Sequence, residues 1–182
     1  MNLRIFYLLL CGLFLAGIVH IAIILLIPKL GSKDVANRIA SLESINQFEL
    51  IGDGREIGIA NSDPYFQLAV CKFDLTTNAI QIIGAPTNVF WSASIFDDRG
   101  RVVYSLSNRT AIERALQLIV LTPVQIAILR QSQPEEIDTS IIVETNSPTG
   151  FVLLRILQND PTRASETKKL LETAQCLPFE TQ

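Results

Sequence analysis

Hydrophobic residues follow three different patterns along the chain, and the first is an unbroken apolar run. Residues 5–27 hold no charged side chain. At about 1.5 Å of rise per residue, a helix of this length crosses the roughly 30 Å hydrocarbon core of a bilayer. Only a helix satisfies its own backbone groups there. We therefore predict one N-terminal transmembrane helix.

The second pattern has a helical period. Pro28 and the Gly31-Ser32 turn predict the end of the first helix, and Ser32 suits the cap of a new one. Apolar residues then recur at positions 35, 39 and 42. We expect a short stalk helix at 33–43. The chain is thus divided into an anchor (1–28), a stalk (29–44) and a domain (45–182).

The third pattern, which begins at Phe48, alternates with a period of two and indicates β-strands. Trp91 and Ile95 alternate with Ser92 and Ser94, which predicts one buried and one more polar face. Short links rich in turn residues favour antiparallel hairpins. The predicted strands are 48–51, 66–75, 79–83, 90–96, 101–106, 116–121, 139–145 and 151–157.

Two later segments return to the helical period. Thr122-Pro123 forms a helix start, and Asp160-Pro161 forms another. We predict peripheral helices at 123–131 and 161–175. The expected fold class is mainly β with peripheral α: a transmembrane helix followed by an antiparallel, sandwich-like domain.

Composition excludes several partners and chemistries. The 182-residue chain carries a net charge of −3 without basic clusters, which is unfavourable for nucleic acid. Its single histidine, His20, lies in the apolar run, so the domain cannot build a Ser-His-Asp triad, a Cys-His pair or a His-ligated metal site. Phosphate-binding glycine motifs are absent from the sequence. We predict no catalytic, cofactor-binding or metal-binding residue.

Acidic residues leave one catalytic alternative open. A carboxylate-dependent hydrolase needs two acids facing each other in a cleft. Asp97-Asp98 lies in a hairpin turn, where aspartate bonds local backbone, and Glu135-Glu136 lies in a loop. Asp74 and Arg155 place charges in apolar strands, and they would form a cross-strand pair if those strands are neighbours.

Aromatic residues in the strands suggest a different kind of site. A β-sandwich that binds carbohydrate or lipid presents aromatic side chains on an open face. The candidate ligand or interaction face contains Tyr65, Phe66, Trp91, Tyr104 and Arg155.

Cys71 and Cys176 are the only thiols outside the apolar run, and three interpretations compete. Cys71 shares a strand face with apolar residues and suits a buried free thiol. A redox-active pair is the least favoured interpretation, because neither cysteine belongs to a C-x-x-C motif. A structural disulfide would close a 105-residue loop and stabilise the domain by up to about 5 kcal/mol. It would also place the domain in an oxidising compartment.

The cysteine pair decides on which side of the membrane we place the domain. The charges that flank the apolar run weakly favour the opposite side. Arg4 precedes the apolar run, whereas Lys29, Lys33 and Arg38 follow it. The run is longer than the apolar part of a signal peptide and is not followed by an A-x-A cleavage site. We expect an uncleaved membrane anchor with the domain on the oxidising side of the membrane.

Several short segments resemble a known family. They are His20-Ile21 with Pro28, Asp63-Pro64-Tyr65-Phe66, Ala69 to Leu75, Phe90-Trp91-Ser92, Asn108-Arg109, and Gly150-Phe151 with Leu154-Arg155. Together they resemble bacterial envelope proteins of the paired domain-of-unknown-function families 1254 and 1214, especially short members with a single anchor. The resemblance implies a bacterial envelope setting and a β-rich domain, and it implies no activity, cofactor or substrate.

The expected function is therefore a membrane-tethered, non-catalytic envelope domain for protein interaction or assembly. The alternatives are a carbohydrate- or lipid-binding module and a carboxylate-dependent hydrolase. The expected partners are the membrane, through the single helix, and another envelope protein.

Overall fold

The computed structural model describes residues 3–42, 44–52, 63, 65–132 and 140–180. The chain forms two compact units, Met1–Asp34 and Val35–Gln182. Helix α1 (Leu3–Ala40) begins in the first unit and ends in the second. Its part Leu3–Ile27 has a mean hydropathy of 2.8 and fits, by length and composition, either a membrane span or a signal sequence.

The predicted end of the first helix at Pro28 is wrong. Helix α1 continues through Pro28 and Gly31 to Ala40, so the expected anchor and stalk helices are one element. A proline inside a helix removes one backbone hydrogen bond. A 38-residue helix keeps the others, and long apolar helices tolerate such interruptions.

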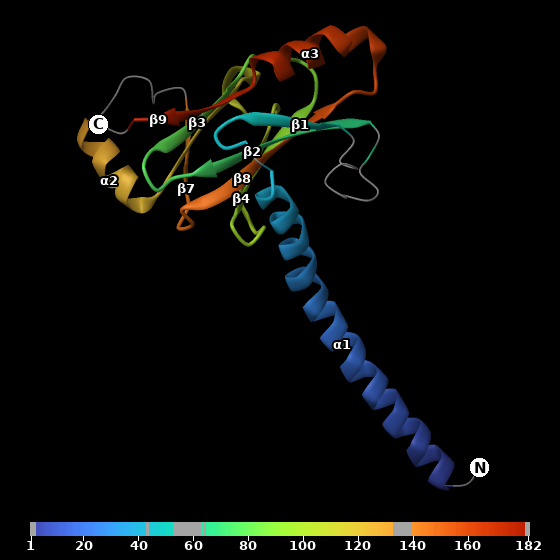
Figure 1. The fold of residues 1–182 in the computed structure, drawn as a ribbon. Helices are drawn as coiled ribbons and strands as arrows, with labels where there is room; N and C mark the ends of the chain where they lie inside the picture. The colour runs from blue at the N-terminus through green and yellow to red at the C-terminus, as the bar shows by residue number, and fades with distance from the viewer. Residues whose placement is uncertain (1–2, 43, 53–62, 64, 133–139, 181–182) are drawn as a thin grey trace. The chain divides into compact units, whose positions relative to one another are not determined.

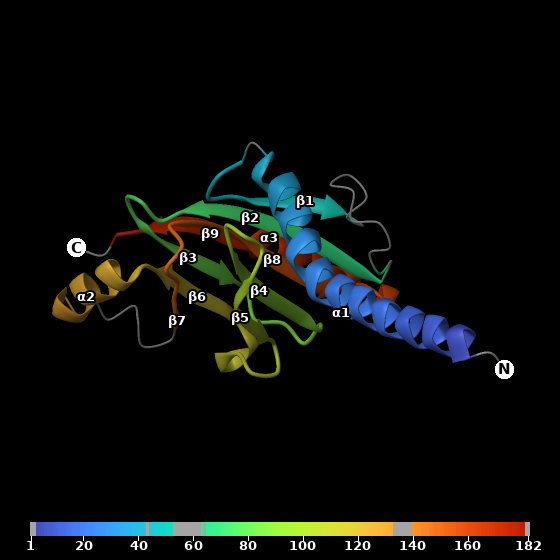
Figure 2. The ribbon, with the colours of Figure 1, turned by 90° about the horizontal axis from the view of Figure 1, so that it is seen from below.

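The second unit is a sandwich of two sheets, seen in Figures 1 and 2. All eight predicted strands are present with bounds within two residues of those expected, and the fold class is confirmed. Among the described residues, sheet A has the order β1-β2-β8-β4-β5 and sheet B the order β7-β6-β3-β9. The strands are β1 (Phe48–Gly52), β2 (Phe66–Asp74), β3 (Ala79–Gly84), β4 (Trp91–Asp97), β5 (Val102–Ser107), β6 (Leu116–Leu121), β7 (Ile141–Glu144), β8 (Thr149–Leu157) and β9 (Gln175–Phe179).

The connections differ from the predicted series of hairpins. The β4–β5 hairpin is as expected, but the link at 75–78 carries the chain from β2 in sheet A to β3 in sheet B. Strands β6 and β7 are parallel, with Leu118 opposite Ile141. Helix α2 (Pro123–Ser132) lies between them in the chain and gives the long crossover that a parallel pair requires.

The core lies between the two sheets. Because side chains alternate along a strand, each strand sends every second residue inward. The inward residues include Ala69, Cys71 and Phe73 of β2, Trp91, Ala93 and Ile95 of β4, Val152, Leu154 and Ile156 of β8, Ile80 and Ile82 of β3, and Leu116, Leu118 and Val120 of β6.

Two helices pack against the sandwich. Ile126 and Leu129 of α2 pack against Ile119 and Leu121 on the outer face of sheet B. A 3₁₀ turn, η3 (Pro161–Arg163), leads into α3 (Ala164–Thr173), whose Leu170 is buried in the core between the sheets. The helix predicted at 161–175 is therefore too long at both ends.

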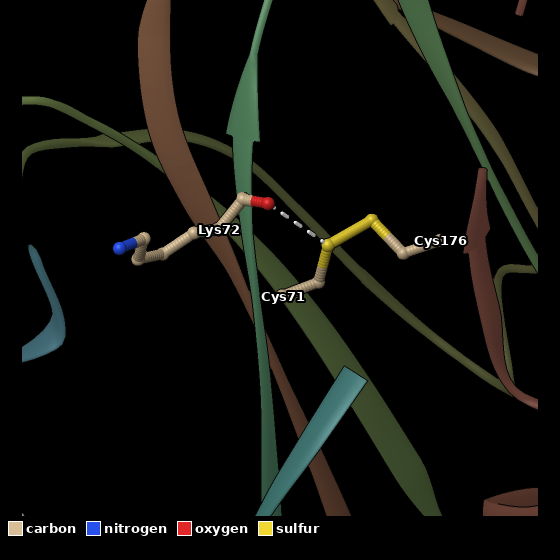
Figure 3. Close-up of a disulfide and its surroundings, with 3 residues drawn as sticks. All are labelled: Cys71, Lys72 and Cys176. Atoms are coloured by element: carbon tan, nitrogen blue, oxygen red, sulfur yellow. Dashed lines mark hydrogen bonds between the residues drawn. A yellow bond between two sulfur atoms is a disulfide. The ribbon is translucent and has the colours of Figure 1, made fainter. Parts of the chain in front are cut away.

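Cys71 and Cys176 form a disulfide, which decides between the three interpretations of this pair (Figure 3). Cys176 lies on β9, a strand that the sequence did not predict, rather than directly after a helix. The bond therefore joins β2 of sheet A to β9 of sheet B. In Figure 3 the Lys72 side chain leaves β2 on the side opposite the disulfide.

Candidate interaction face

The outer face of sheet A is the best candidate for a binding surface, because it carries both an apolar cluster and exposed polar side chains. The last turns of α1 cover one part of it. Ala36 and Ile39 are buried in one apolar cluster with Leu68, Val70 and Phe151. This cluster uses the outward residues of β2 and β8, the face opposite the core.

A charged contact completes the attachment of α1. Lys72 Nζ donates hydrogen bonds to the backbone oxygen of Ala40, at 3.0 Å, and to that of Leu42. A cation near a helix C-terminus interacts favourably with the last carbonyl groups. Strand β2 thus holds the end of α1 through both apolar burial and hydrogen bonding.

Beyond α1 the same face carries exposed and half-buried side chains. We call this part the open face and define it by Phe66, Ser92, Ser94, Ser105 and Arg155. Register places Ser92 opposite Arg155, and Ser94 opposite Ser105. The Oγ atoms of Ser94 and Ser105 lie 2.9 Å apart. Because serine side chains are short, they project little from the sheet, and each presents a hydroxyl group that can form hydrogen bonds.

An aromatic–cation pair borders the serines. The Arg155 guanidinium carbon lies 4.6 Å from the centre of the Phe66 ring. The Phe66 ring in turn meets Phe90 edge-on, with 6.4 Å between centroids. An exposed cation–π contact contributes about 0.5–1 kcal/mol. The pair therefore holds the guanidinium in place while leaving its donors accessible.

The structure brings together only part of the predicted face. Phe66 and Arg155 are in contact, and Tyr65, 59% exposed, precedes Phe66 in the chain. Tyr104 lies on the edge strand β5, opposite Ile95. Trp91 is fully buried on the inward side of β4, so its assignment to this face is wrong.

The three serines were not predicted as site residues, although the alternation of Ser92 and Ser94 with Trp91 and Ile95 indicated a polar side of β4. Only strand register shows that this side faces the same way as Arg155. Register also rules out the suggested Asp74–Arg155 pair. The strands β2 and β8 are neighbours, but Asp74 lies opposite Thr149 and Arg155 opposite Leu68.

A polar cavity of about 590 Å³ lies at the β4–β5 turn, where Asp97, Asp98 and Glu144 contribute carboxylates. Asp97 is 4% exposed, and its Oδ1 accepts hydrogen bonds from the backbone N–H groups of Arg99 (3.0 Å) and Arg101 (2.8 Å). Its Oδ2 accepts one from Arg101 Nε at 2.7 Å. Glu135 and Glu136 lie outside the described residues.

These contacts decide the protonation state of Asp97. Burial acts to raise the pKa of Asp97, but the hydrogen bonds from Arg101 and Arg99 outweigh it, so the pKa is lowered. A carboxyl group that acts as general acid near neutral pH needs a raised pKa. Asp97 is instead held as an anion that fixes the hairpin.

Comparison with solved structures finds proteins of similar fold, whereas comparison of the sequence identifies no family. The structure is similar to the VPA0106 protein from Vibrio parahaemolyticus, with a TM-score of 0.58, 11% identity, and coverage of 81% of this chain and 36% of that one. A protein from Burkholderia cenocepacia gives a TM-score of 0.45 at 11% identity, over 74% of this chain and 34% of that one. The chain thus spans about a third of each solved protein. No protein-family model and no curated protein matches the sequence.

Proposed function

We propose that this chain is a membrane-tethered, non-catalytic interaction domain that docks another envelope protein on its open face. The observation that carries the proposal is the division of the outer face of sheet A. Helix α1 covers the apolar part. Beside it, Arg155 and Ser105 are exposed, and Phe66, Ser92 and Ser94 are half-buried.

The tether and the compartment have separate support. The apolar part of α1 is long enough to span a bilayer, and the Cys71–Cys176 disulfide fits an oxidising compartment. We infer a single-pass protein of a bacterial inner membrane whose domain lies in the periplasm. The proposed relationship to families 1254 and 1214 agrees with this setting.

The composition of the open face suits a protein partner. Arginine and aromatic residues are enriched at protein interfaces, and Arg155 and Phe66 supply one of each. The similarity to VPA0106 bears on the fold alone, and it supports the sandwich that carries this face.

A carbohydrate ligand is a second candidate for the same face. The Phe66 ring beside the Arg155 guanidinium and the paired hydroxyl groups of Ser94 and Ser105 resemble the stacking and hydrogen-bonding groups that saccharides use. A saccharide that releases the captured partner would favour this candidate.

The test compares variants of the affinity-tagged full-length chain purified from detergent-solubilised membranes. Wild type is expected to retain a partner in constant ratio to the chain. Arg155→Glu reverses a charge on β8, and Ser105→Arg adds bulk on β5, so each is expected to release the partner. Arg130→Glu, an exposed arginine on α2, is the matched control and should retain it. Retention by both face variants would contradict the proposal, provided that Trp91 fluorescence shows an intact core.

A further inference from the structure

A small cavity of about 280 Å³ lies where the end of α1 meets sheet A. Its apolar wall includes Ala36 and Ile39 of α1 and Phe151 of β8, three buried residues of the cluster that attaches the helix. Asp74 of β2 and Asp98 of the β4–β5 turn line the same cavity. We call it the α1 cavity and define it by these five residues. Concave, mainly apolar walls with a few polar groups are typical of small-molecule sites.

The two carboxylates flank the first residues of β8. Asp74 lies opposite Thr149 on one side of this strand, and Asp97, the residue before Asp98, lies opposite Gly150 on the other side. Strands β2 and β4 are both neighbours of β8, so their backbones lie about 10 Å apart. One bound cation between two aspartate side chains can bridge that separation.

The protein does not neutralise these carboxylates in the part of the chain that the structure describes, where neither Asp74 nor Asp98 forms an ion pair. Hydrogen bonds from the hydroxyl and the backbone N–H of Thr76 lower the pKa of Asp74, which keeps it ionised. Lys72 also lines the cavity, but its Nζ donates to backbone oxygens at the end of α1. The cavity therefore combines an apolar wall with a net negative charge.

We propose that the α1 cavity binds a small amphipathic amine, a primary ammonium group on an apolar body about the size of one aromatic ring. The body would pack against Ala36, Ile39 and Phe151. The ammonium group would donate charge-assisted hydrogen bonds to Asp74 and Asp98. An anion would be repelled by both carboxylates, and a small polar cation would leave the apolar wall uncovered.

This site shares no residue with the open face, so the proposal does not depend on protein docking there. Calorimetric titration of the full-length chain in detergent, with the detergent alone as blank, tests it. The probes are phenethylamine, 2-phenylethanol, 3-phenylpropionate and ethylamine. Phenethylamine is expected to bind at least about tenfold more tightly than the other three, because only this probe supplies both the positive charge and the apolar body.

Three results of the titration would overturn the proposal. Equal affinity for phenethylamine and 2-phenylethanol would show that the carboxylates do not select a cation. Equal affinity for phenethylamine and ethylamine would show that the apolar wall contributes nothing. No binding of phenethylamine in the millimolar range would show that the cavity is not a site for this class of ligand.

Protein variants place the binding at this cavity. Asp98→Asn is expected to raise the dissociation constant for phenethylamine about tenfold, the effect of losing one charge-assisted hydrogen bond. Asp98 is an exposed turn residue, so this variant is expected to fold. Glu180→Gln removes an exposed carboxylate outside the cavity and is the matched control, which should leave the affinity unchanged. Equal affinities for the two variants would overturn the assignment.

Hydrogen exchange gives a second measurement of the place of binding, on the wild-type chain. Phenethylamine is expected to slow exchange at residues 36–42, because a ligand that binds only the folded state stabilises the structure that it contacts. Exchange in β7, which contributes no residue to the cavity, should stay unchanged. Unchanged exchange at residues 36–42 in the presence of bound phenethylamine would show that the amine binds elsewhere.

Discussion

At the scale of single residues, Asp97 shows how one carboxylate organises a hairpin. The β4–β5 turn needs a left-handed residue, supplied by Gly100 with φ of 71°. Gly100 N–H donates to the backbone oxygen of Asp97 at 3.0 Å, while the Asp97 side chain accepts from Arg99 and Arg101. The sequence correctly predicted a turn aspartate that bonds local backbone. Its deep burial depends on tertiary packing and could not be read from the turn itself.

Asp97→Asn is expected to lower the free energy of unfolding by about 1–3 kcal/mol at pH 7, because hydrogen bonds to an anion are lost or weakened. The lowered pKa of Asp97 sets the pH dependence. Its contribution is complete above the unfolded value of about 3.9 and disappears as the pH falls through the folded pKa. The difference in free energy of unfolding between the wild type and Asp97→Asn should therefore become smaller below about pH 4. Urea unfolding of the full-length chain, followed by Trp91 fluorescence at pH 7 and pH 3, measures it.

Asp98→Asn is the matched control, since Asp98 is the exposed neighbour in the same turn. Its effect should stay within about 0.5 kcal/mol at both pH values. An Asp97→Asn effect that is equally large at pH 3 would show that the carboxylate charge is not what stabilises the hairpin.

At the scale of elements, β2 connects three parts of the domain. Its inward Cys71 is bonded to β9, its outward Lys72 binds the end of α1, and its backbone pairs with β1 and β8. Alternation along one strand is enough to produce this double attachment. The end of α1 therefore depends on the strand that also carries the disulfide.

Lys72→Met keeps most of the side-chain length and removes the donor to Ala40 and Leu42. We expect a loss of about 1–2 kcal/mol, because the last helix carbonyls lose a charged partner. Hydrogen exchange should become faster at residues 36–42 and stay unchanged in β4 and β8. Lys168→Met, an exposed lysine on α3, is the control. Similar exchange in both variants would show that Lys72 does not hold the helix end.

Sequence patterns predicted individual elements better than their connections. Strands such as β4 were found because buried and half-exposed residues alternate along them, and β6 because it is apolar on both faces, whereas β9 was missed. Its Pro178 interrupts a strand pattern, and Leu177 is 42% exposed on an edge strand. Helix α1 continues beyond Pro28, because the low helix propensity of a single proline does not end a helix of 38 residues. The parallel β6–β7 pair was not predicted, because the sequence was interpreted as a series of antiparallel hairpins even though α2 provides the crossover that a parallel pair needs.

At the scale of the whole molecule, the sandwich must be held together across its two sheets. The 75–78 link and the apolar core join sheet A to sheet B, and the disulfide adds a covalent bond between residues 105 positions apart. Closing so long a loop stabilises the folded state by up to about 5 kcal/mol in the chain-entropy description. That is a large part of the 5–15 kcal/mol typical of domains. The sequence indicated this pair, because only two thiols lie outside the apolar run, but not the sheets that it joins.

The oxidation state of the Cys71–Cys176 pair in the cell reports on which side of the membrane the domain lies. If the domain lies in the periplasm, Cys71 and Cys176 are oxidised in the cell and Cys11 is the one free thiol. Alkylation of the denatured full-length chain is then expected to modify one thiol without reductant and three with it, as counted by mass spectrometry. Cys11→Ser should lower these counts to zero and two. Three reactive thiols before reduction would mean that the domain folds in a reducing compartment, and the proposed periplasmic docking would fail with it.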